Sequence, residues 1–200
     1  GCCPTCNEWG SITELQEART TPSQSHSRTV RLPIPRALSD IQSSSLERMV
    51  TKIEEWDRVM GGGIMPGSFI MVTGDPGIGK STLLLQVAHN LSKQYNVLYF
   101  SSEESLEQVR LRAERLSCTD SSLLFFDQAD LDSVLGVMEQ YKPDLIIIDS
   151  IQNCYSAETK TIPGSVGQLR EAAFKLMRCA KDNKVATIVT GHITKEGTVA

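Results

Sequence analysis

The sequence predicts a three-layer α/β fold built around a mostly parallel β-sheet. From about Thr51 onward, short apolar runs that favour strands alternate with longer runs that carry apolar residues at helical spacing. The run Leu145-Ile146-Ile147-Ile148 has no alternation of polar and apolar residues, which indicates a strand buried on both faces. Repeated strand–helix units with such strands place helices on both faces of a parallel sheet.

Each expected element follows from this alternation. The expected strands are Phe69–Thr73, Val97–Ser101, Leu123–Phe126, Leu145–Asp149 and Ala186–Thr190. The expected helices are Ser81–Gln94, Leu106–Leu116, Leu131–Gln140 and Val166–Asp182. Asp130 is a suitable N-cap for the helix that starts at Leu131, and Pro143 closes that helix.

Composition limits the class of protein. The 200 residues are 40% hydrophobic and 22% charged, which is typical of a soluble protein with a core. No apolar run approaches the ~20 residues that span a bilayer, and no secretory leader is recognisable, so we expect a cytoplasmic protein. The net charge of −4 does not indicate nucleic-acid binding, although a local loop can still concentrate positive charge.

Three regions differ in composition. Residues 1–18 contain Cys2, Cys3 and Cys6, residues 19–50 are rich in Ser, Thr, Pro and Arg and have the character of a linker, and residues 51–200 form the expected globular domain. The other cysteines are scattered, which favours reduced thiols over a disulfide framework. The chain begins with Gly and not Met, and we expect it to be an excerpt, open at both ends.

The segment GDPGIGKST, from Gly74 to Thr82, matches the phosphate-binding pattern G-x-x-x-x-G-K-[ST]. It stands between an expected strand and an expected helix, which is the context in which this pattern binds phosphate. Lys80 is expected to reach the β- and γ-phosphates, and the Ser81 hydroxyl is expected to hold Mg²⁺. A glycine-rich turn that binds nothing is the less favoured alternative, so the sequence predicts a nucleoside triphosphate site. The residues expected at the nucleotide are Gly74, Asp75, Pro76, Gly77, Ile78, Gly79, Lys80, Ser81 and Thr82.

Acidic residues follow two of the expected strands. Asp149 ends a buried strand, where a carboxylate can orient Mg²⁺ or its water ligands; its alternative role is to cap the following loop. Glu103 and Glu104 follow the strand Val97–Ser101, where a carboxylate can polarise the water that attacks the γ-phosphate. Their alternative role is a solvated first turn of a helix, favoured by the helix dipole. Glu103 is the favoured catalytic residue, and both roles stay open for Glu104.

Several longer segments together resemble the RecA-like ATPases, and among them the bacterial RadA (Sms) family of DNA-repair proteins. These segments are WDRVMGGGIMPGS from Trp56, GDPGIGKS from Gly74, SEES from Ser102, DSIQ from Asp149 and GHITKEG from Gly191. In addition, CPTCNEW from Cys3 is similar to the second half of that family's four-cysteine zinc ribbon. The resemblance implies a RecA-like P-loop sandwich, preceded by a partial zinc ribbon and a linker.

The resemblance also implies an ATPase that uses ATP and Mg²⁺. It makes Lys80 and Ser81 the phosphate and Mg²⁺ ligands, Asp149 the Walker B acid, and Glu103 the hydrolytic carboxylate. His192 falls where RecA-like proteins place a polar sensor of the γ-phosphate; the alternative is a strand-end histidine in solvent.

Zinc and DNA contacts are implied by the resemblance alone. Cys3 and Cys6 would be zinc ligands in the full-length protein, but two thiolates do not complete a tetrahedral site. Cys2 would add a third thiolate only with awkward geometry, and His26 is a more distant candidate. Lys160 and Lys195 are candidate contacts to DNA phosphates, although a lone lysine is usually solvated. The family's Lys-Asn-Arg-Phe-Gly motif is absent from these 200 residues, which places full ATPase activity of this chain alone in question.

The function implied is an ATPase of DNA repair and recombination, stimulated by single-stranded DNA, that acts in branch migration and processing of recombination intermediates. Its implied partners are single-stranded and branched DNA, further copies of itself in a hexameric ring, and a recombinase. One alternative is a KaiC-like regulatory ATPase without DNA motor activity. Another is a non-catalytic module that binds nucleotide and a protein partner.

Overall fold

A computed structural model describes residues 35, 37–40, 47–119, 122–128, 130–155 and 165–192 of the chain. The chain divides into two compact units, Gly1–Gln42 and Ser43–Ala200. In the first unit the described residues include a short 3-10 helix, η1, at Leu38–Asp40. The second unit contains all other helices and strands of the described residues.

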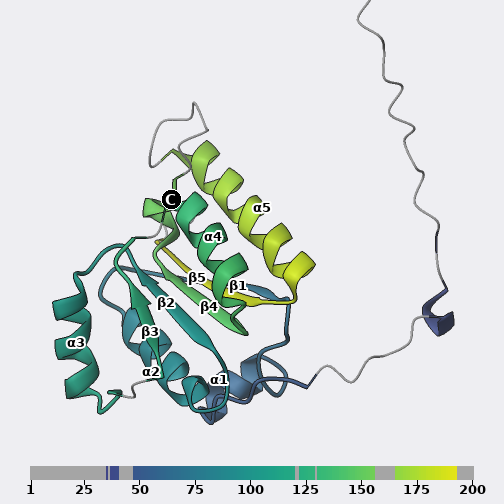
Figure 1. Ribbon diagram of the computed structural model, residues 1–200. Coiled ribbons are helices and arrows are strands. Elements are labelled where there is room, and N and C mark those ends of the chain that lie inside the picture. Colours follow the sequence, from purple (N-terminus) through teal and green to yellow (C-terminus); the bar gives the residue numbers. More distant parts are fainter. Residues whose placement is uncertain are drawn as a thin grey trace, which may run out of the picture. The chain divides into compact units, whose positions relative to one another are not determined.

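A single five-stranded sheet organises the second unit (Figure 1). Its strands are β1 (Phe69–Gly74), β2 (Val97–Ser101), β3 (Leu124–Phe126), β4 (Leu145–Asp149) and β5 (Ala186–His192). They lie in the order β1-β5-β4-β2-β3, and every neighbouring pair is parallel. The mostly parallel sheet predicted from the buried apolar runs is therefore confirmed.

The helices follow the predicted alternation, with small differences at their ends. They are α1 (Glu54–Val59), α2 (Lys80–Ser92), α3 (Leu106–Arg115), α4 (Leu131–Tyr141) and α5 (Val166–Asn183), and a 3-10 turn, η2, occupies Ile151–Asn153. The Asp130 side chain accepts a hydrogen bond from the Ser133 N–H and caps α4, as predicted. Helix α1 was not predicted, because it has six residues and buries only Trp56, too little for a helical period to be visible.

The last strand is longer than predicted. It was expected to end at Thr190, but it continues through Gly191 and His192 because these residues pair with Thr73 and Gly74 of β1. The helix expected to reach Gln94 ends at Ser92, and the chain then turns so that the N–H groups of Gln94 and Tyr95 both bond to the Leu91 carbonyl.

Two core clusters cover the two faces of the sheet, which gives the three layers. Side chains of α1, α2 and α3 pack on one face against alternate strand residues that include Tyr99, Ile147 and Ile188. Side chains of α4 and α5 pack on the other face against Phe100, Ile148 and the residues in phase with them. Figure 1 shows α4 and α5 side by side over that second face. Because strand side chains alternate between faces, each buried strand contributes to both cores.

The parallel pairing brings the carboxyl ends of the strands to one edge of the sheet. Ser101 at the end of β2 is in register with Asp149 at the end of β4, and Gly74 at the end of β1 is in register with His192 at the end of β5. Ligands of open α/β sheets bind outside this edge. Among the described residues, no helix is long and apolar enough to cross a membrane.

Candidate functional site

The phosphate-binding pattern forms a tight loop between β1 and α2. Gly77 and Gly79 have φ values of 79° and 106°, a left-handed backbone that side chains other than glycine rarely adopt. Gly79 is also the N-cap of α2 and has no side chain to accept a hydrogen bond from the helix. The first N–H groups of α2 therefore receive no hydrogen bond from a capping side chain and can bind an anion at the loop, as helix N-termini that bind phosphate do.

The Lys80 side chain bonds to two carbonyl groups of this loop. Its Nζ donates to the carbonyl oxygens of Gly74 at 2.7 Å and Asp75 at 3.0 Å. The same Nζ lies 3.5 Å from Nδ1 of His192. The ammonium group is thus held at the loop, between β1 and β5, where it can meet a phosphate group.

Glu103 and His192 meet at the same place. His192 Nε2 lies 3.1 Å from Oε1 of Glu103, and the Ser150 hydroxyl also donates to that carboxylate oxygen. If Nδ1 accepts from the Lys80 ammonium, Nε2 carries the proton and donates to Glu103. Lys80, His192 and Glu103 then form one continuous chain of polar contacts across the end of the sheet.

Glu104 has a different environment from Glu103. Its carboxylate forms an ion pair with the guanidinium of Arg112, and the two side chains are 33% and 16% exposed. The Glu104 carbonyl also accepts a hydrogen bond from the Ser101 hydroxyl at 2.8 Å. Glu104 therefore joins the end of β2 to α3, and its charge is balanced by a partly buried arginine.

Asp149 is buried, and each of its two carboxylate oxygens accepts a hydrogen bond. Its Oδ2 accepts a hydrogen bond from the Tyr99 hydroxyl at 2.9 Å, and its Oδ1 accepts one from the Thr190 hydroxyl at 2.7 Å. Burial, and then the charge of Asp149, raise the pKa of the Tyr99 hydroxyl well above its usual value, so Tyr99 stays protonated and remains a donor. Asp149 is only 7% exposed, yet it lines the pocket at the phosphate loop.

These groups surround one pocket of about 410 Å³. Of the predicted residues, the pocket is lined by Pro76, Gly77, Gly79, Lys80, Ser81, Thr82, Glu103, Glu104, Asp149 and His192. Gly74 and Asp75 do not line the pocket, but their carbonyl oxygens accept hydrogen bonds from Lys80, which does. Ile78 does not line it either and is 70% exposed. The structure thus brings together residues predicted separately from four strand ends, those of β1, β2, β4 and β5.

Five residues of this site were not predicted, one of which is Ser150, whose hydroxyl donates to Glu103. Arg112 and Arg115 of α3 line the pocket, and Tyr99 and Thr190 hold Asp149. The position of the two arginines after the SEES segment was visible in the sequence, but nothing there indicated that α3 turns them toward the phosphate loop. Tyr99 and Thr190 stood within apolar strands, where a single polar group gives no signal of its partner.

The chemistry of the pocket fits a nucleoside triphosphate with Mg²⁺. Loop N–H groups and Lys80 supply donors for phosphate oxygens. The Ser81 hydroxyl and the Asp149 carboxylate line the same pocket, and a hydroxyl with one carboxylate, completed by phosphates and waters, is the usual protein share of a Mg²⁺ site. No group of three or more His, Cys, Asp or Glu side chains that could hold a metal ion occurs in the described part of the chain.

Some predicted residues lie outside the part of the chain that the structure describes. These are Cys3 and Cys6 of the proposed zinc site, Cys2 and His26 near them in sequence, and the candidate DNA contacts Lys160 and Lys195. Zinc binding and these DNA contacts therefore stay predictions.

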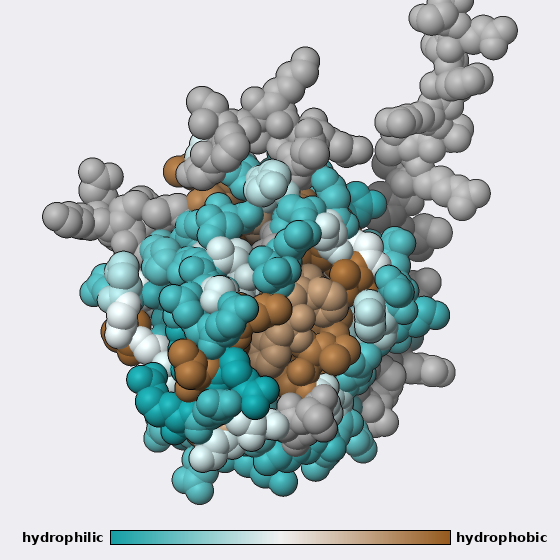
Figure 2. Space-filling model, turned by 60° about the vertical axis from the view of Figure 1, so that its left-hand side comes forward, coloured by the Kyte–Doolittle hydropathy of each residue, from teal (hydrophilic) through white to brown (hydrophobic). Residues whose placement is uncertain are grey.

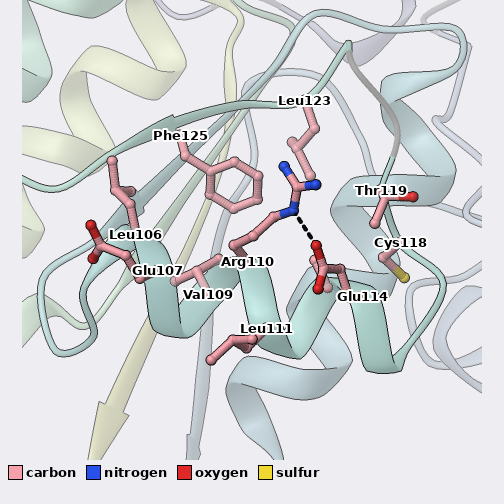
Figure 3. Close-up of a pocket in the computed structure, with 11 residues that line it drawn as sticks. Leu106, Glu107, Val109, Arg110, Leu111, Glu114, Cys118, Thr119, Leu123 and Phe125 are labelled. Carbon is pink, nitrogen blue, oxygen red and sulfur yellow. Dashed lines mark hydrogen bonds and ion pairs between the residues drawn. The ribbon is translucent and has the colours of Figure 1, made fainter.

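A second, larger cavity of about 760 Å³ lies under α3 and contains none of the predicted residues. It is lined mainly by apolar side chains, such as Val109 and Ala113 of α3, Phe125 of β3 and Leu123 just before β3 (Figure 3). Arg110, ion-paired with Glu114 at 2.7 Å, lies along it. Figure 2, in which the α3 side comes forward, shows apolar residues gathered in a hollow with hydrophilic residues around it. Helix α3 therefore separates an apolar cavity from the charged pocket at the phosphate loop.

A parallel sheet with a phosphate loop between β1 and α2, and with carboxylates at the ends of β2 and β4, defines a P-loop domain of the RecA-like type. A protein-family model described as an AAA domain matches residues 35–198. The chain therefore belongs to this family. The RecA-like P-loop fold predicted from the sequence is confirmed.

Similarity to an individual protein is more specific than the match to the family model. The chain is 44% identical, over 200 residues, to the DNA repair protein RadA of Streptococcus pyogenes serotype M6. The alignment covers 100% of this chain and 44% of the relative, so the chain spans less than half of the relative's length. The resemblance to RadA seen in the sequence motifs is confirmed.

Solved structures share the fold. The crystal structure of the flagellar accessory protein FlaH from Methanocaldococcus jannaschii has a TM-score of 0.55 at 24% identity, covering 76% of this chain and 74% of that chain. A structure of a DnaB-like replicative helicase has a TM-score of 0.63 at 17% identity, covering 76% of this chain and 45% of that chain. At these identities the likeness concerns the fold alone.

Proposed function

We propose that this chain is the nucleotide-binding part of a DNA-repair ATPase that binds and hydrolyses ATP with Mg²⁺. The observation that carries the proposal is that Lys80, Ser81, Glu103, Asp149 and His192 line a single pocket at the phosphate loop. The 44% identity to a DNA repair protein supports the biological role.

Each side chain has a distinct part in the proposed reaction. The N–H groups of the loop and of α2 bind the phosphate oxygens, and Lys80 moves from the loop carbonyls to the β- and γ-phosphates. Ser81 and Asp149 would hold Mg²⁺, which would neutralise charge that develops on the phosphate oxygens.

Glu103 is the proposed hydrolytic carboxylate. It accepts hydrogen bonds through Oε1 from Ser150 and His192, and no described residue donates a hydrogen bond to its Oε2. That oxygen can accept a proton of the attacking water and polarise it. Glu104 is the less suitable candidate, because Arg112 neutralises its charge.

His192 is the proposed link between hydrolysis and the rest of the molecule. It bridges Lys80 and Glu103 at the last residue of β5. A γ-phosphate that draws Lys80 away removes one of the two contacts of His192. The imidazole is then free to reorient toward the γ-phosphate, while its contact with Glu103 can persist.

The more specific role in DNA processing is implied by the resemblance to the RadA family. We infer a homo-hexameric ring in the cytoplasm that acts on single-stranded and branched DNA in branch migration, with a recombinase as a further partner. DNA stimulation of hydrolysis, DNA contacts by Lys160 and Lys195, and zinc bound by Cys3 and Cys6 with an upstream cysteine pair belong to this inference.

The test compares binding of a fluorescent ATP analogue to the wild type and to Lys80→Ala. Removing the ammonium should weaken binding by roughly 10- to 100-fold, because a hydrogen bond to a charged group contributes about 1.5–3 kcal/mol. Lys93→Ala, at an exposed lysine just beyond α2, is the matched control and should bind as the wild type does. Equal affinity in Lys80→Ala and the wild type would refute the assignment of the phosphate loop.

A further inference from the structure

We propose that Tyr99 and Thr190 are positioning residues for Mg²⁺, because together they hold the Asp149 carboxylate in the orientation that faces the phosphate loop. The inference rests on the proposed function, in which Asp149 takes part in holding Mg²⁺. It adds two residues to the site that do not line the pocket and do not belong to a sequence motif.

The three side chains come from three adjacent strands. Tyr99 lies on β2, Asp149 on β4 and Thr190 on β5, and β4 is the strand between the other two. The register pairs Tyr99 with Ile147, two residues before Asp149, so Tyr99 and Asp149 point to the same face of the sheet. That face is the one covered by α2, the helix that follows the phosphate loop.

The two hydroxyls bind opposite oxygens of the carboxylate. The Tyr99 hydroxyl is 2.9 Å from Oδ2, and the Thr190 hydroxyl is 2.7 Å from Oδ1. A carboxylate held through one oxygen can still rotate about its terminal torsion, which has a broad energy profile. Donors at both oxygens, from the two flanking strands, fix the plane of the group.

With both of these hydrogen bonds in place, the Asp149 carboxylate can still bind a cation. Each carboxylate oxygen has two lone-pair sites, so one site per oxygen remains after the two hydroxyls have bound. Asp149 lines the pocket beside Ser81, whereas Tyr99 and Thr190 are 1% and 0% exposed. The two hydroxyls are thus out of reach of a ligand in the pocket, and any effect they have on Mg²⁺ acts through Asp149.

If the hydroxyls of Tyr99 and Thr190 had a purely structural role, the expected result would differ. If the hydroxyls only satisfy a buried charge, removing one lowers stability and leaves the Mg²⁺ requirement unchanged. If they position Asp149, removing one raises the Mg²⁺ requirement. Partners of this kind around metal ligands typically change metal affinity by about 10- to 100-fold.

The experiment measures affinity for a fluorescent ATP analogue across a series of free Mg²⁺ concentrations and also in EDTA. Tyr99→Phe removes one hydroxyl and keeps the ring that packs against Phe125, and Thr190→Val removes the other hydroxyl at nearly constant volume. Each variant should raise the half-saturating Mg²⁺ concentration roughly 10-fold. Affinity in EDTA should stay at the wild-type value, because loop contacts to phosphate are intact.

Two controls make the result specific. Thr190→Ser keeps a hydroxyl and should restore the wild-type Mg²⁺ requirement. Tyr141→Phe removes a phenol at the end of α4, on the opposite face of the sheet, and should have no effect. Thermal unfolding of each variant shows that it is folded, and Thr190→Val carries the test if Tyr99→Phe does not fold.

The outcomes separate this inference from the proposed function. A wild-type Mg²⁺ requirement in both Tyr99→Phe and Thr190→Val, with Asp149→Asn impaired, would overturn the positioning role alone. A wild type whose affinity does not respond to Mg²⁺, or an Asp149→Asn variant that responds normally, would overturn the Mg²⁺ assignment of Asp149 and this inference with it.

Discussion

The two adjacent glutamates after β2 have different partners, and we propose different roles for them on this ground. Glu103 meets His192 and Ser150 at the phosphate loop, while Glu104 forms an ion pair with Arg112 of α3. A residue that polarises water must have a carboxylate oxygen free to accept a proton. At the scale of single residues, the structure therefore favours Glu103 for chemistry and Glu104 for holding α3 in place.

We predict that Glu103→Gln binds ATP as the wild type does but loses turnover by roughly 10²- to 10⁴-fold, the usual contribution of a general base. Steady-state ATPase assays beside binding assays measure the two effects. Glu104→Gln is the matched variant, and its turnover should stay within a few-fold of the wild type. An inactive Glu104→Gln with an active Glu103→Gln would reverse the assignment.

Glycines at two positions show how elements constrain substitution. Gly63, in the turn after α1, has a φ of 126°, and a Cβ added there would lie 2.7 Å from the Met49 carbonyl oxygen. That carbonyl accepts a hydrogen bond from Ile64, and both Met49 and Ile64 are buried, so neither side of the contact can move freely. Gly136, within α4, has open space around its Cβ position.

We predict opposite effects on stability for Gly63→Ala and Gly136→Ala. The first should lower the free energy of unfolding by about 1–3 kcal/mol or more, because it adds backbone strain and a steric clash. The second should raise it by about 0.5–1 kcal/mol, because alanine favours a helix over glycine. Denaturant unfolding measures both. A Gly63→Ala variant as stable as the wild type would show that the Met49–Ile64 pairing does not fix this turn.

Helices, strands and loops could be predicted where a few consecutive residues determine them. The phosphate loop, the buried strand ending at Asp149 and the Asp130 cap each follow from a few consecutive residues. Helix α1 was missed because its six residues bury only one side chain. The extension of β5 to His192 was missed because it depends on pairing with β1.

At the scale of the whole molecule, contacts between distant strands decided what could not be predicted. Asp149 is 50 residues from Tyr99 and 41 residues from Thr190 in the chain. The three meet because the sheet places β4 between β2 and β5, an order that no local pattern reveals. The same strand order joins Glu103 to His192, 89 residues apart.

The proposed role of the whole protein lies in DNA repair, and the relative RadA is more than twice the length of this chain. We predict that hydrolysis by the full-length protein is stimulated by single-stranded DNA and that the chain of 200 residues binds ATP but turns it over more slowly. The dependence on length follows if parts of the protein beyond this chain complete the site.

The most direct measurement is the ATPase rate of the full-length protein with and without single-stranded DNA, with Glu103→Gln measured beside it. We predict Mg²⁺-dependent hydrolysis that rises with DNA in the wild type and is absent in Glu103→Gln under both conditions. Hydrolysis that does not respond to DNA would favour a regulatory ATPase, and the same rate in Glu103→Gln as in the wild type would contradict the proposed site itself.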